Sequence, residues 1–114
     1  MLLVLLILLL AVALGGVTLA TLELRGRPVP LPVGALHGTA GIVLIVLLVI
    51  HVVRFPRNMP VNAATALFML TASGGLLLFA FRAGRQRLPG LVLGLHAAFA
   101  LAAISLMLVG YLHG

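Results

Sequence analysis

The sequence predicts an all-α integral membrane protein, a four-helix bundle in up-down-up-down order. Of its 114 residues, 64% are hydrophobic and 7% are charged, a composition far from that of soluble domains. The apolar residues gather into segments of about twenty residues, the length that a helix needs to cross a bilayer. A chain this small cannot bury so much apolar surface within itself, so we expect the remainder to face lipid.

Four such segments follow one another along a single domain, residues 1–114. Short polar connections that contain proline separate them, and connections this short make neighbouring helices antiparallel. The predicted helices span residues 2–22, 35–54, 62–81 and 90–112.

Local signals support each segment in turn. The first lacks a basic stretch before it and is longer than the apolar part of a signal peptide, so we interpret it as a membrane helix. Pro32 and Pro89 suit the first turns of the second and fourth helices, where a missing N–H has no consequence. Asn62 is the predicted N-cap of the third.

The two halves of the chain share a pattern at an offset of 59 residues. Each half contains a glycine pair, a basic turn, a proline and a Leu-His pair, which predicts an internal duplication with halves of about 1–57 and 58–114. The second and fourth helices are then parallel, and their histidines lie at the same depth. The matching pairs are Gly15-Gly16 with Gly74-Gly75, and Leu36-His37 with Leu95-His96.

The orientation follows from the arginines, which make up all seven basic residues. Five of them lie in the first and third connections and two beside the second, so the positive-inside rule places the first and third connections in the cytoplasm and both termini outside. We expect the cell inner membrane.

Histidines within the apolar segments are the candidate functional residues, because ionisable groups are costly in hydrocarbon. His37 and His51 lie fourteen residues apart, which places them within about 40° of one helix face and about 21 Å apart along the axis. With His96 and His113 they suggest two axial pairs for haem iron: His37 with His96, and His51 with His113. The second pair departs from the pattern, because His113 follows His96 by seventeen residues and is penultimate.

Small residues surround the first pair, with Gly41 on the same stripe as His37. They serve either close helix packing or a flat macrocycle wedged between helices, and composition does not separate the two. Arg27 and Arg85 are expected at the level where haem propionates emerge, since guanidinium groups pair well with carboxylates.

This pattern resembles the membrane b-type cytochromes, in which two helices each carry two histidines and hold two stacked haems. His37 and His51 match the thirteen-residue gap on the ligand helices of the quinol-oxidising cytochrome b family. His96 matches the first ligand of the partner helix, while Gly110 stands where its second ligand should be. The resemblance covers the second and fourth segments. It implies one or two non-covalent haem b groups with bis-histidine ligation, and electron transfer with a membrane redox partner or as a subunit of a larger complex.

The residue types present also exclude several other functions. No cysteine is present, which excludes disulfides, iron–sulfur clusters and covalently attached haem, and no basic stripe indicates a nucleic acid. No acid–base pair or nucleophile indicates catalysis, so an electron carrier without its own catalytic site is favoured. The alternatives are a cofactor-free accessory subunit of a membrane complex and a chlorophyll-type pigment protein. A small drug exporter is rejected, because its mid-membrane carboxylate is missing and the one acid is Glu23.

Overall fold

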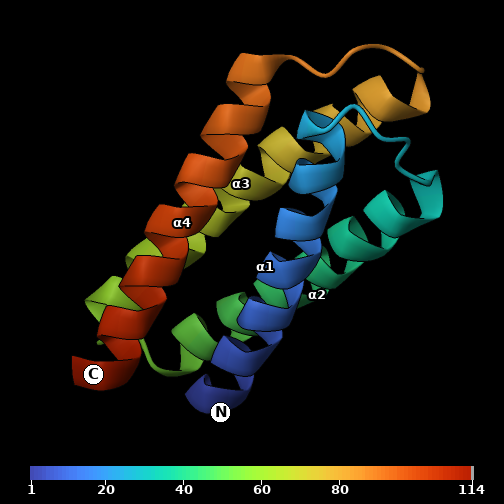
Figure 1. Ribbon diagram of the computed structural model, residues 1–114. Helices are drawn as coiled ribbons and strands as arrows, with labels where there is room; N and C mark the ends of the chain where they lie inside the picture. Colours follow the sequence, from blue (N-terminus) through green and yellow to red (C-terminus); the bar gives the residue numbers. More distant parts are fainter. Residues whose placement is uncertain (114) are drawn as a thin grey trace.

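The computed structural model describes residues 1–113 and contains four helices over that range, each long and apolar enough to cross a membrane. They run up and down, so that both chain ends lie at one end of the bundle (Figure 1). The predicted multi-pass four-helix bundle is therefore confirmed. The helices are α1 (Leu2–Leu24), α2 (Leu31–Arg54), α3 (Met59–Ala83) and α4 (Gly90–His113).

The helices are arranged in a ring that follows the chain. Each packs against its neighbour in sequence, and α4 closes the ring against α1, while α1 and α3, and likewise α2 and α4, lie on the diagonals. The α3–α4 contact is the closest and the α1–α4 contact the loosest. We call the end with both termini and residues 55–58 the terminal end, and the end with residues 25–30 and 84–89 the double-loop end. The two helices with the histidines thus face each other across the bundle.

Two helices begin earlier than the sequence predicts. α2 starts at Leu31, one residue before Pro32, since proline fits the first turn. For α3, the predicted N-cap Asn62 was wrong: Asn58 caps the helix, and its side chain accepts a hydrogen bond from the Val61 amide at 3.3 Å. The amide group of Asn62 instead donates to a loop carbonyl at 2.9 Å.

Asn58 also joins α3 to α4, because its amide nitrogen donates to the Gly110 carbonyl at 3.0 Å. We expect Asn58→Ala to lower the free energy of unfolding by about 2 kcal/mol, since a lost cap and a lost interhelical hydrogen bond are each worth about 1 kcal/mol. Thermal unfolding in detergent checks this, with Asn62→Ala as the matched control. An equal loss in both variants would contradict the cap assignment.

The hairpins α1–α2 and α3–α4 repeat the same local structure at the offset of 59. After α1, Gly26 has a φ of +66°, and after α3 the equivalent Arg85 has a φ of +56°. The backbone hydrogen bonds of the two turns also correspond, for example from Gly26 to Glu23 and from Arg85 to Arg82, at 3.1 and 3.0 Å. The offset read from the sequence therefore also relates the turn geometry of the two hairpins.

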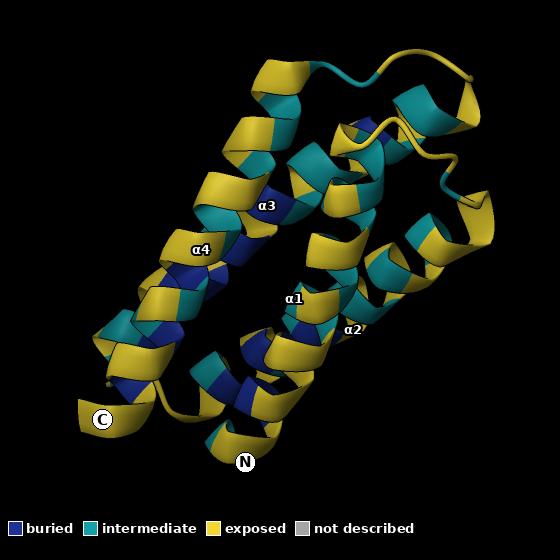
Figure 2. Ribbon diagram, in the orientation of Figure 1, coloured by how far each residue is buried: buried dark blue, intermediate teal, exposed yellow. Residues whose placement is uncertain are grey.

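Buried residues are concentrated toward the terminal end (Figure 2). Outside the core cluster, α3 has three further buried residues, Thr65, Thr71 and Leu78. The described parts of the other three helices have no buried residue toward the double-loop end. Fewer side chains are therefore fully buried at that end than at the terminal end. The core cluster consists of Leu5, Leu6, Leu9, Leu44, Leu48, Val61, Ala64, Phe68, Ala103 and Met107.

Candidate functional site

His37 and His96 lie on the interior stripes of α2 and α4. The buried residues of α2 are Leu44, Leu48 and His51, and those of α4 are the equivalent Ala103, Met107 and Gly110. His37 precedes Leu44 by seven residues and His96 precedes Ala103 by seven, a spacing that returns a helix to the same face. Both histidines are half-buried, so each continues the core stripe toward the double-loop end.

Each of these two rings rests against a glycine pair on the preceding helix. A Cβ atom added to Gly16 would lie 3.0 Å from Cε1 of His37, and one added to Gly75 would lie 3.0 Å from Cε1 of His96. Any larger residue at Gly16 or Gly75 must therefore displace the imidazole. The glycine pairs therefore leave room for the imidazole rings. This role was not predicted from the sequence, although the glycines and the histidines share the offset of 59 residues.

A backbone carbonyl forms a hydrogen bond with the ring of His96 but not with that of His37. The Nδ1 atom of His96 lies 2.8 Å from the Thr71 carbonyl oxygen. Because a carbonyl only accepts, Nδ1 carries the proton in this hydrogen bond and Nε2 keeps its lone pair. On the other hairpin, the main chain of the equivalent Val12 lies near His37, but Nδ1 of His37 is buried without a hydrogen-bond partner among the described residues.

Space for a ligand adjoins the first histidine. A groove of about 380 Å³ between α1 and α2 reaches His37 and is almost entirely apolar. The groove is lined by Leu8, Ala11, Val12, Gly15, Val33, Leu36, His37, Ala40, Val43 and Leu44.

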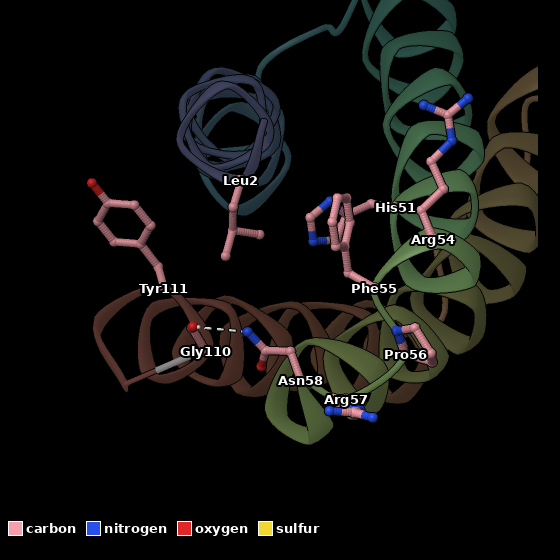
Figure 3. A pocket seen from close by; sticks show the side chains of 9 residues that line it. All are labelled: Leu2, His51, Arg54, Phe55, Pro56, Arg57, Asn58, Gly110 and Tyr111. Carbon is pink, nitrogen blue, oxygen red and sulfur yellow. Dashed lines mark hydrogen bonds between the residues drawn. The ribbon is translucent and has the colours of Figure 1, made fainter.

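The other two histidines are not brought together. His51 is buried and lines a separate cavity of about 480 Å³ at the terminal end, whereas His113 is exposed and does not line it (Figure 3). The position equivalent to His51 is Gly110, where an added Cβ would overlap the side chain of Val61 and lie 2.9 Å from Oδ1 of Asn58. The close α3–α4 contact leaves no room for a histidine at residue 110.

This close contact leads to a stability prediction. We expect Gly110→Ala to destabilise the protein by about 1–3 kcal/mol, the usual range for overpacking. Gly94→Ala is the matched control on the same helix, because an added Cβ there meets nothing within 4 Å. Thermal unfolding in detergent compares the two. Equal unfolding temperatures would show that α4 moves away from α3 without loss.

The remaining predicted site residues are Gly41, at the contact with α1, and the two loop arginines Arg27 and Arg85. A Cβ on Gly41 would make an ordinary 3.9 Å contact with Val12, so contact with α1 does not itself require glycine. Arg27 and Arg85 are exposed at the double-loop end, the end nearer His37 and His96.

An ion pair also joins the two hairpins at the double-loop end. Nη2 of Arg82 lies 2.9 Å from Oε2 of Glu23, the residue at the equivalent position of the first hairpin. This pairing of equivalent positions was not predicted from the sequence.

Comparisons with protein-family models, curated proteins and solved structures found no match for this chain. Within residues 1–113, no three histidine, cysteine or acidic residues come together as a metal site. The described residues therefore offer two imidazoles on diagonal helices rather than a multidentate cage.

Proposed function

We propose that this membrane protein binds one haem b between α2 and α4, with His37 and His96 as axial ligands, and carries electrons. The observation that supports this most strongly is the paired placement of the two rings. They occupy equivalent positions on the interior stripes of diagonal helices, each against a glycine pair. They also lie in the half of the bundle where few side chains are buried.

The surroundings of the rings fit this role. A histidine that binds metal typically donates its other ring N–H to a carbonyl or carboxylate, which fixes the tautomer. The Nδ1 hydrogen bond of His96 to the Thr71 carbonyl is of this type and leaves Nε2 for a metal. For His37, the buried Nδ1 lacks a partner and the Val12 main chain is nearby, so we expect a small ring movement to complete the equivalent bond upon ligation.

Two histidines would occupy both axial positions, which favours electron transfer over oxygen chemistry at the metal. When bound, haem b supplies a one-electron redox centre. The protein would contribute the two imidazoles, and Arg27 and Arg85 as partners for propionates. We place the double-loop end in the cytoplasm of a cell with an inner membrane, and we propose a membrane redox protein as the electron partner.

A reduced-minus-oxidised visible spectrum of the purified protein, with haem quantified per chain, tests this proposal. We expect a b-type α-band and about one haem per chain, since the structure offers one matched histidine pair. Two haems per chain would require His51 as a ligand and contradict the single site. A colourless protein, after expression with sufficient haem, would reject the cytochrome and favour a cofactor-free accessory subunit.

A further inference from the structure

The ion pair at the double-loop end connects two helices that are not neighbours in the ring. Nη2 of Arg82 on α3 lies 2.9 Å from Oε2 of Glu23 on α1. These helices lie on a diagonal and have no close backbone approach to each other, so the two side chains bridge the bundle from one side to the other. Among the described residues, no other hydrogen bond or ion pair joins the α1–α2 hairpin to the α3–α4 hairpin.

The two members of the ion pair lie on the same helix faces as the glycines that adjoin the histidine rings. Glu23 follows Gly16 by seven residues, and Arg82 follows Gly75 by seven. Seven residues return a helix to within about 20° of the same face and advance it by about 10 Å. Because Gly16 and Gly75 adjoin the rings, the ion pair lies about two helical turns from the histidine pair, toward the double-loop end.

Arg82 differs from the other arginines at this end in its position and its partner. It belongs to α3 and its side chain is 19% exposed, whereas Arg27 and Arg85 are exposed residues of the connecting loops. Glu23 is the only acidic side chain of the protein, and it bonds to Arg82 although Arg25 and Arg27 are closer in sequence. The guanidinium group of Arg82 is thus already placed to bind a carboxylate on the side of the bundle interior.

We propose that Glu23 holds the place of a haem propionate in the haem-free protein, and that Arg82 exchanges Glu23 for that propionate when haem binds. This exchange depends on the proposed haem site. A guanidinium group binds either carboxylate through the same charge-assisted hydrogen bonds. Because Glu23 and a propionate are both negative, they compete for Arg82 and repel each other. Glu23 therefore connects the two hairpins in the absence of haem and opposes haem binding.

Titration of haem into the haem-free full chain in detergent tests the exchange through the dissociation constant. We expect Glu23→Gln to bind haem about threefold tighter than the unchanged protein and Arg82→Gln to bind it about threefold more weakly, effects of the size that partly exposed ion pairs have. Both substitutions remove the same ion pair, so they should lower the unfolding temperature of the haem-free protein equally. An ion pair with a structural role alone would change haem affinity in the same direction in both variants.

Two controls accompany the titration. Haem dimethyl ester, which lacks free propionates, should bind Glu23→Gln and Arg82→Gln with equal affinity. Arg87→Gln, an exposed arginine at the same end, should bind haem as the unchanged protein does. Equal haem affinities of Glu23→Gln and Arg82→Gln would overturn the exchange and leave the haem site standing. If the unchanged protein bound neither haem nor its ester, the proposed function would be rejected, and the exchange with it.

Discussion

Replacing either His37 or His96 with alanine is expected to abolish haem binding. Each supplies one of the two proposed axial bonds, and no other histidine of the described chain lies on an interior stripe at this level. Loss of a group that only supports a ligand weakens metal binding about 10–100-fold, so we expect loss of a ligand itself to cost at least about 100-fold in affinity. Haem per chain after purification measures the effect.

His113→Ala is the matched control, because His113 is exposed and lines neither the groove at His37 nor the cavity at His51. It should retain the haem content of the unchanged protein. Added imidazole should restore part of the binding in His37→Ala and His96→Ala, which separates a missing ligand from a misfolded chain. Full haem content in either alanine variant would show that the iron is bound elsewhere.

Replacing Gly16 or Gly75 with leucine is also expected to weaken haem binding, although less than the loss of a histidine. A Cβ at Gly75 already approaches Cε1 of His96 to 3.0 Å, so the leucine side chain of Gly75→Leu must push the ring out of its position. Gly16→Leu should do the same to His37. Because ligands must be held within about 0.5 Å of the productive geometry, we expect at least a tenfold loss of haem affinity in each variant.

The controls are Gly38→Leu and Gly94→Leu, since a Cβ at either position meets nothing within 4 Å. Far-ultraviolet circular dichroism should show helix in all four variants. The haem spectrum should be weaker in Gly16→Leu and Gly75→Leu than in the two controls. If Gly75→Leu bound haem as well as Gly94→Leu, the glycine pairs would have no role in placing the rings.

Much of the fold could be predicted from the sequence because the bilayer imposes a length on each apolar segment. The largest errors fall at the starts of α2 and α3, and α1 and α3 also end two residues later than predicted. Asn58 rather than Asn62 caps α3 because Met59 and Pro60 form its first turn, and a proline near a helix start is compatible with several starting residues. Such a choice depends on tertiary contacts, here the bond from Asn58 to Gly110.

The candidate site was only partly predictable for a similar reason. Spacing alone could indicate that His37 and His96 are equivalent, since the offset of 59 is visible in the sequence. It could not show that His51 lines a cavity from which His113 is absent. That outcome depends on how closely α3 and α4 approach at Gly110, and interhelical distance is set by side chains from both helices together.

Electron paramagnetic resonance of the oxidised, purified protein is the sharpest test of haem binding by His37 and His96, because it reports the axial ligands of haem iron. We expect a low-spin ferric signal of bis-imidazole type that disappears in both His37→Ala and His96→Ala and persists in His51→Ala. A high-spin signal in the unchanged protein, or a low-spin signal that survives loss of His37 or His96, would contradict ligation by this pair.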